Sequence, residues 1–293
     1  MKSKITQGHL AALVTILIWG TTFISTKILL NVFHPIEILF IRFTLGFVIL
    51  AIAYPRILHI KDKRKEITFA LAGLCGVCLY YLLENIALTY TLAANVGVII
   101  SVAPFFTAIV SRLVSKDEKL RINFFVGFLV AMVGIFCISF NGQALEINPL
   151  GDVLALIAAF IWALYSVLTR KISQYGYNTI QSTRRVFAYG LVFMIPVLFV
   201  FDFDIELQQF SEPTNIFNIL YLGAGASALC FVTWNIAVKI LGAVKTSIYI
   251  YMVPVITVVT SVIILGEKLT LMSGIGTALT LLGLIISEYK GKK

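Results

Sequence analysis

The amino-acid sequence predicts an all-α integral membrane protein with ten transmembrane helices, arranged as two inverted five-helix repeats. Composition is the first indication: 59% of the 293 residues are hydrophobic and only 13% are charged, whereas soluble domains are about half apolar and a quarter charged. Apolar runs are the second, because a membrane span needs about 20 such residues and ten runs follow one another with short connections. The third is an internal similarity between the two halves.

The first five-helix repeat occupies residues 1–146. Its first run follows Lys2 and Lys4, as a signal peptide would, but it is longer than a signal's apolar region and lacks a small-x-small exit, so we interpret it as a helix. A basic connection, 56–65, follows the second run, and the uncharged-to-acidic turn 141–148 closes the half. The predicted spans are 9–30, 35–54, 67–90, 93–114 and 122–140.

The second repeat occupies residues 147–293. Its longest polar connection, 202–214, is acidic. The predicted spans are 150–169, 179–201, 215–238, 243–265 and 271–288.

Basic residues are distributed unevenly between the connections. The N-terminus and every second connection after it lie on one side of the membrane, and together with the C-terminus they carry 20 of the 23 Lys and Arg residues. The connections on the opposite side carry only Lys268. The remaining two, Lys27 and Arg42, lie inside spans. Positively charged loops stay on the cytoplasmic side. We therefore predict a multi-pass protein of the cell membrane with both termini cytoplasmic. The net charge of +9 then reflects orientation, and the lipid bilayer rather than nucleic acid is the expected partner.

The two halves repeat one pattern. Because each unit holds five spans, an odd number, the second copy enters the membrane from the opposite face. Two such copies can exchange inward-open and outward-open forms of similar energy, which favours a transporter over a duplication kept only for packing. The matched residues are Asn85 with Asn235 and Pro104 with Pro254 at a shift of 150, Trp19 with Trp162 and Arg42 with Arg185 at 143, and Gly127 with Gly276 and Gly134 with Gly283 at 149.

Several segments stand out: IWGTTF at Trp19, IWALYS at Trp162, PIEILFIRF around Arg42, NIALTYT before Pro104, and VPVITVVTSVIILGEKLT leading into GIGTALTLLGLII. Together they resemble the EamA-like permeases of the drug/metabolite transporter superfamily. The resemblance covers nearly the whole chain and implies a five-plus-five inverted-repeat fold that moves a small-molecule substrate, often by export of amino acids or related compounds. It also allows a homodimer. LGEKLT matches the family's usual ending of the ninth helix, whereas the first copy has VSKDEKLR at the corresponding place.

Glu84 and Arg42 are the candidate residues for substrate binding or coupling. By the helical rise they lie roughly 9 and 10 Å below the same membrane surface, where an unpaired ionisable group costs roughly 2.5 kcal/mol or more. In one interpretation the two residues bind the substrate or a coupling ion, which would be a proton. In the other they form a structural ion pair between the second and third spans. Lys27 lies near a span end and is interpreted as an anchor.

Pro104 and Pro254 are the candidate gating residues. Each removes a helix donor inside a span and frees carbonyls that water, a neighbour or a ligand must satisfy. Their matched positions favour a mechanical role, with a passive kink as the alternative.

Aromatic residues and two asparagines complete the candidate site. Trp19 and Trp162 are mid-span and repeated, which favours cavity lining, whereas Tyr80, Tyr81, Tyr165, Trp234, Tyr249 and Tyr251 fit lining and packing equally well. Asn85 and Asn235 fit hydrogen bonding between helices better than substrate binding. The repeated glycines, seven apart, fit close helix packing.

The sequence predicts neither an enzyme nor a cofactor or metal site. Cys75 and Cys78 have half of a zinc spacing but no nearby histidine, and GxxxxGK[ST] is absent. An intramembrane hydrolase is the first alternative, disfavoured because His9, His34 and His59 fall at span ends. A channel or a sensor scaffold is the second.

Overall fold

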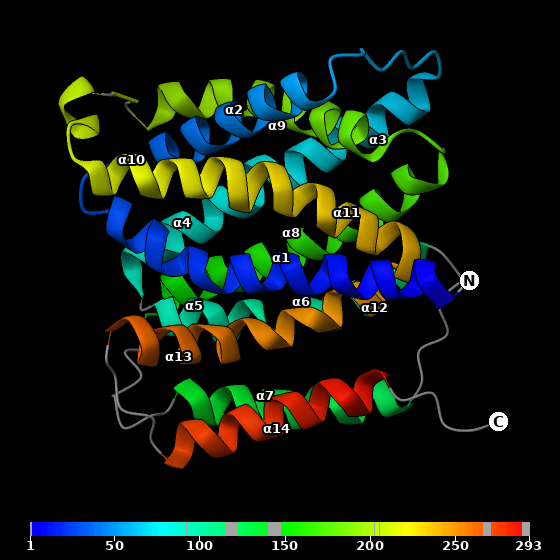
Figure 1. Ribbon diagram of the computed structural model, residues 1–293, viewed down its shortest axis with the longest axis vertical. Helices are drawn as coiled ribbons and strands as arrows, with labels where there is room; N and C mark the ends of the chain where they lie inside the picture. Colours follow the sequence, from blue (N-terminus) through cyan, green and yellow to red (C-terminus); the bar gives the residue numbers. More distant parts are fainter. Residues whose placement is uncertain are drawn as a thin grey trace.

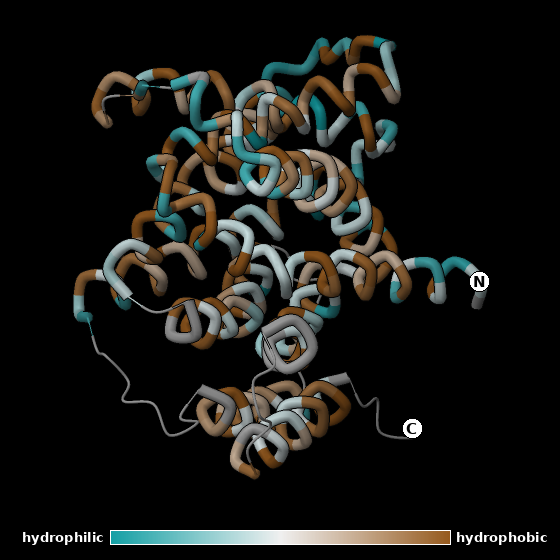
Figure 2. The backbone as a smooth tube through the Cα atoms, turned by 60° about the vertical axis from the view of Figure 1, so that its left-hand side comes forward, coloured by the Kyte–Doolittle hydropathy of each residue, from teal (hydrophilic) through white to brown (hydrophobic). Residues whose placement is uncertain are grey.

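The computed structural model describes residues 2–91, 93–114, 122–139, 148–201, 203–204, 206–265 and 271–288, and these ranges contain helices and no strand. Seven helices are long and apolar enough to cross a membrane, and three shorter apolar helices complete the ten spans. Hydrophobic residues recur along the helices, whereas hydrophilic ones mark the N-terminal end (Figure 2). The predicted fold class is confirmed, and the helix bounds agree with the predicted spans to within a few residues except at the extended ends of the first, third and sixth.

Local signals set the helix starts in the first half. Pro35 occupies the first helical position of the second span, and the backbone N–H of His34 donates to the Glu37 carboxylate at 2.8 Å. Asp62 caps the third span by accepting from the Arg64 N–H at 2.9 Å. The elements are α1 (Lys2–Leu29), α2 (Pro35–Ala53), α3 (Lys63–Gly73), η1 (Leu74–Leu79), α4 (Tyr80–Tyr90), α5 (Ala93–Ile100), α6 (Ala103–Val114) and α7 (Ile122–Ser139).

The second half repeats this order. Asn148 and Asn178 cap its first two helices with their side-chain oxygens, and Gly242, at φ 94°, ends the long third span. The elements are α8 (Pro149–Gln174), α9 (Thr179–Val200), η2 (Leu207–Phe210), α10 (Pro213–Leu220), η3 (Tyr221–Leu229), α11 (Cys230–Leu241), α12 (Ala243–Ser247), η4 (Ile248–Tyr251), α13 (Met252–Leu265) and α14 (Leu271–Glu288).

The third span of each half contains a π-helical stretch, which is η1 in the first half and η3 in the second. A shift of 150 residues places η1 inside η3. Such wide turns inside α-helices are rare and are frequent at functional sites. Both stretches pack against the second span of the other half, η1 against α9 and η3 against α2.

Helices α7 and α14 lie side by side at one edge of the bundle (Figure 1). Their repeated glycines face each other: a Cβ on Gly127 would lie 2.5 Å from the Gly283 carbonyl oxygen, and one on Gly134 would lie 2.6 Å from that of Gly276. The glycines thus meet crosswise, each against the glycine that the repeat matches to the other one, and the packing interpretation of these glycines is confirmed.

The connections lie at two opposite edges of the bundle (Figure 1). One edge holds the N-terminus, the segment between α2 and α3, and the α8–α9 and α11–α12 connections; we call it the basic face. The other edge holds the α1–α2, α4–α5 and α9–α10 connections. The described part of the chain does not include residues 115–121 and 141–147, Lys268 or most of the LGEKLT segment.

Candidate functional site

A central cavity lies among helices of both halves, with a volume of about 40 Å³. A water molecule needs roughly 10–15 Å³ in this measure, so the cavity holds a few waters in this conformation. α1 contributes Trp19, Thr22 and Phe23, and α4 contributes Tyr80, Tyr81 and Glu84. The other walls are Gly97, Ile100 and Ser101 around the end of α5, Trp162 of α8, and Ile250 and Val253 of the ninth span.

Two broken helices meet at this cavity. The fourth span is interrupted at Ser101 and Val102, and Pro104 lies in the first turn of α6; the ninth span passes through the 3₁₀ turns of η4 before Pro254, in the first turn of α13. Proline has no N–H, so the carbonyls four residues earlier, those of Ile100 and Ile250, receive no helical bond from it. Both isoleucines line the cavity. Each proline thus lies directly after an irregular stretch of its span, the interruption at Ser101 and Val102 in the fourth and the 3₁₀ turns in the ninth.

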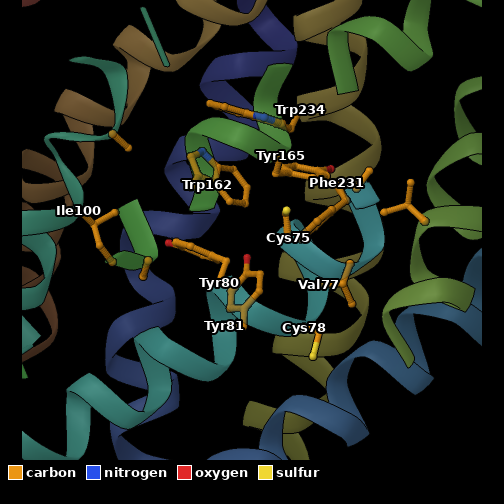
Figure 3. Close-up of a cluster of buried hydrophobic side chains, with 14 of the residues drawn as sticks. Cys75, Val77, Cys78, Tyr80, Tyr81, Ile100, Trp162, Tyr165, Phe231 and Trp234 are labelled. Carbon is orange, nitrogen blue, oxygen red and sulfur yellow. The ribbon is translucent and has the colours of Figure 1, made fainter. Parts of the chain in front are cut away.

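Aromatic rings form the cavity wall shared by α1, α4 and α8. The Trp19 and Trp162 rings meet edge to face with centroids 5.2 Å apart, and the Tyr80 ring lies 4.7 Å from that of Trp162. Figure 3 shows Tyr80 between Trp162 and Tyr81, with its hydroxyl directed toward the side on which Ile100 lies. The structure thus places both repeated tryptophans at the cavity.

The two indole N–H groups have different surroundings. Nε1 of Trp19 donates to the Ala226 carbonyl at 3.0 Å. Nε1 of Trp162 is buried and has no hydrogen-bond partner among the described residues. A buried donor without a partner costs about 1–3 kcal/mol. Trp162 thus lines the cavity, whereas its indole N–H is buried.

Glu84 is the acidic residue of the cavity lining, and it is 7% exposed. Tyr80, one turn earlier on α4, lines the same cavity. Among the described residues the one ion pair within 4 Å joins Arg185 to Glu66, so Glu84 forms no such pair with Arg42. Glu84 borders the cavity instead.

Arg42 is buried next to the cavity wall but does not line the cavity. Its Nε donates to the Ser227 hydroxyl of η3 at 3.0 Å, and its guanidinium carbon lies 4.5 Å from the centre of the Tyr81 ring. A cation over an aromatic face is attracted by the ring quadrupole. Arg42 thus contacts Tyr81 of its own half and η3 of the second half, whereas the matched Arg185 pairs with Glu66 near the basic face.

Four of the residues expected to bind the substrate do not line the cavity: Arg42, Asn85, Asn235 and Tyr249. Nδ2 of Asn85 donates to the Pro35 carbonyl at 3.2 Å, and Asn235 connects Thr183 at 2.9 Å with Tyr165 at 3.1 Å. Both amides bridge helices.

Tyr249 and Lys27 also have defined partners. The Tyr249 hydroxyl contacts Nδ1 of His9, and Nζ of Lys27 donates to the Leu88 carbonyl at the end of α4 at 3.0 Å.

Several lining residues were missed from the sequence: Thr22, Phe23, Gly97, Ile100, Ser101, Ile250 and Val253. A signal existed for part of this set. Thr22 and Phe23 lie three and four residues after Trp19, on the same face of a helix, and Ile100 and Ile250 each precede a matched proline by four residues. No sequence signal pointed to Gly97 and Ser101, because the interruption of the fourth span does not appear as a pattern in the sequence.

Cysteine and metal chemistry have no built site in the described part of the chain. All four cysteines are free thiols, and Cys75, Cys78 and Cys230 are buried. No group of three His, Cys, Asp or Glu residues gathers there in metal-binding geometry.

Comparison with known proteins identifies the family of the chain. The model of the EamA-like transporter family matches residues 6–140 and 149–289. The chain belongs to this family. An uncharacterized transporter of Archaeoglobus fulgidus is 28% identical over 97% of this chain and 98% of its own length. A probable amino-acid metabolite efflux pump of Salmonella typhimurium is 26% identical over 97% and 95%.

A solved crystal structure shares the fold, with a TM-score of 0.79 and 19% identity over 97% of both chains. EamA-like proteins form a membrane fold of two repeats. The family and its relatives are transporters rather than enzymes, so the chain is a multi-pass membrane transporter with a small-molecule substrate.

Proposed function

We propose that this EamA-like protein is a secondary transporter that exports amino acids or related metabolites by alternating access, with the two repeats at 1–146 and 147–293. The observation that carries the proposal is the central cavity, where the broken spans of both repeats meet beside a buried carboxylate. The relative named as a probable amino-acid metabolite efflux pump supports the substrate class.

The chemistry of the cavity suits a solute with an amine and an apolar part. Glu84 supplies a negative charge for an ammonium group, and the rings of Trp19, Trp162 and Tyr80 supply apolar and π surface. If Glu84 releases a proton as it takes up the ammonium group, the proton is the coupling ion.

Transport requires the helices around the cavity to move. A volume of about 40 Å³ accommodates a few waters and no metabolite. The breaks at Ser101 and in η4 divide two spans into half-helices, which can tilt with little loss of internal hydrogen bonds. We infer that these half-helices open the cavity alternately to the two sides.

Counter-flow in proteoliposomes tests the proposed function. Purified protein would be reconstituted into vesicles preloaded with one unlabelled amino acid, and uptake of the same radiolabelled amino acid would be followed across a panel. A carrier gives saturable uptake that trans-loading accelerates. Uptake that rises linearly with concentration and does not depend on the amino acid inside the vesicles would indicate a channel. Absence of flux for every amino acid of the panel would refute the amino-acid assignment.

We expect both termini and the 56–65 segment to be cytoplasmic, because these connections carry the basic residues. In a cysteine-free chain, an impermeant thiol reagent applied to intact cells should label Ser211→Cys but not Asp62→Cys. Both positions are exposed. Labelling of Asp62→Cys alone would reverse the orientation, and labelling of both or neither would contradict the inverted arrangement of these two connections.

Pro104→Ala and Pro254→Ala should each lower the turnover rate more than the apparent substrate affinity. Alanine restores a donor for the Ile100 or Ile250 carbonyl and stiffens the broken span, while the cavity side chains stay in place. Initial rates over a range of substrate concentrations measure both quantities. Pro196 of α9 is the matched control, because it lies inside a span whose helix is unbroken, away from the cavity. Rates in Pro104→Ala and Pro254→Ala equal to that of Pro196→Ala would show that the breaks are passive.

A further inference from the structure

A second cavity, of about 270 Å³, opens near the basic face between the end of α2, the segment that follows it and the first half of α9. Its lining combines a polar end, Gln181, Arg184 and Arg185, with an apolar remainder that includes Phe47, Ala51 and Ala188. It shares no lining residue with the central cavity. We propose that this cavity, which we call the α2–α9 groove, binds an anionic phospholipid from the adjacent leaflet.

The polar end presents a fixed cation that has no acidic partner in the described part of the chain. Nη1 of Arg184 donates to the backbone carbonyl of Tyr54, and Nη2 donates to that of Arg56, both at 2.6 Å. Gln181 donates to the same Arg56 carbonyl at 3.0 Å. Carbonyls orient the guanidinium but do not cancel its charge, and three of its five N–H groups remain for another acceptor. Arg184 is thus held in place with its positive charge uncompensated by these contacts.

Arg185 provides a second guanidinium, whose charge is partly cancelled. Its Nε donates to Glu66 at 2.8 Å, its Nη2 contacts the same oxygen, and Tyr189 donates to it as well. Around this pair the segment 56–65 adds five further basic residues and one acid, Asp62. The surroundings of the groove are therefore net positive, which complements a phosphate group.

The apolar end continues onto a surface that faces lipid. Val48 and Ile52 of α2 are 44% and 73% exposed, and Val192 of α9 is 56% exposed. Exposed aliphatic side chains on spanning helices contact acyl chains in a bilayer. A ligand that fills the α2–α9 groove thus contacts cations at the membrane surface and aliphatic side chains below it. A phospholipid fits this arrangement, because its charged headgroup lies at the membrane surface and its acyl chains lie below.

The experiment uses the full-length protein in detergent with added lipid. Thermal stability and native mass spectrometry would be measured with phosphatidylglycerol, with phosphatidylcholine and with glycerol 3-phosphate. We expect phosphatidylglycerol to raise the melting temperature more than phosphatidylcholine does, and to stay bound in the mass spectrum. Glycerol 3-phosphate should give no shift, because it lacks the chains that fill the apolar end.

Two variants test the two ends of the groove. Arg184→Gln should weaken phosphatidylglycerol binding roughly fivefold, because one basic residue near the membrane surface contributes about this factor to the binding of anionic lipid. Ala188→Leu fills the apolar end without a change of charge and should reduce binding as well, so the test stands even if Arg184→Gln folds poorly. Lys171→Gln is the control: it removes an exposed cation at the same face, outside the groove, and should bind as the wild type does.

Three outcomes would overturn the proposal. Equal binding of phosphatidylcholine and phosphatidylglycerol would remove the role of the arginines. Equal losses in Lys171→Gln and Arg184→Gln would indicate diffuse attraction to the surface. Unchanged binding in Ala188→Leu would place the lipid elsewhere.

Discussion

Glu84→Gln should abolish transport and leave the protein folded. The carboxylate lines the central cavity and has no ion-pair partner among the described residues, so its charge is available to a solute. A structural ion pair would behave differently, because removal of one partner of a buried pair costs roughly 3–5 kcal/mol. Counter-flow and thermal melting of the same preparation measure the two effects separately.

Two companion variants sharpen this test. Glu84→Asp keeps the charge and should retain part of the activity. Arg42→Gln removes the buried cation that supports Tyr81, and combining it with Glu84→Gln tests whether the two charges depend on each other. A folded Glu84→Gln protein with wild-type flux would refute the role of Glu84, whereas a destabilised one rescued by Arg42→Gln would establish a structural pair.

Gly134→Leu should destabilise the protein more than any change at the cavity. A Cβ at this position would lie 2.5 Å from the Thr280 backbone nitrogen and 2.6 Å from the Gly276 carbonyl oxygen. Backbone atoms cannot move aside as a flexible side chain can, so α7 and α14 must separate. We expect a loss of about 3 kcal/mol or more, at the upper end for overpacking, seen as lower yield and melting temperature.

Gly274→Leu is the matched control for this prediction. Gly274 lies on α14 as well, and a Cβ there meets no atom within 4 Å among the described residues. The same change of residue should therefore leave the melting temperature near that of the wild type. Equal destabilisation of both variants would indicate that glycine itself, rather than the helix contact, matters at these positions.

The sequence was sufficient for the spans because length and polarity decide where a membrane helix begins and ends. Predicted and observed bounds agree at Pro35, Tyr90 and Glu288. It was also sufficient for the glycine packing, since the glycines spaced seven apart in each half do pack closely against those of the other half. It could not predict the π-helical stretches η1 and η3, which depend on packing against the other half.

The candidate site was predictable only in part. Trp19, Trp162 and Glu84 stood out because bulky or charged residues are unusual at mid-span, and they line the cavity. Tyr249 looked equally suitable, yet its hydroxyl turns toward His9 on α1. The direction of a side chain in a broken span depends on the local helix geometry, and the 3₁₀ turns of η4 cannot be read from the periodicity of the sequence.

The central claim is that the solute passes through the cavity between the two broken spans, and Gly97→Leu tests it most directly. Gly97 lines the cavity, and a Cβ there meets no atom within 4 Å among the described residues. A leucine should therefore fill the space without a clash, and in a helix it is favoured over glycine by nearly 1 kcal/mol. We expect a melting temperature at or above that of the wild type, with counter-flow abolished, while Gly274→Leu transports normally. Wild-type counter-flow in a folded Gly97→Leu protein would contradict the claim.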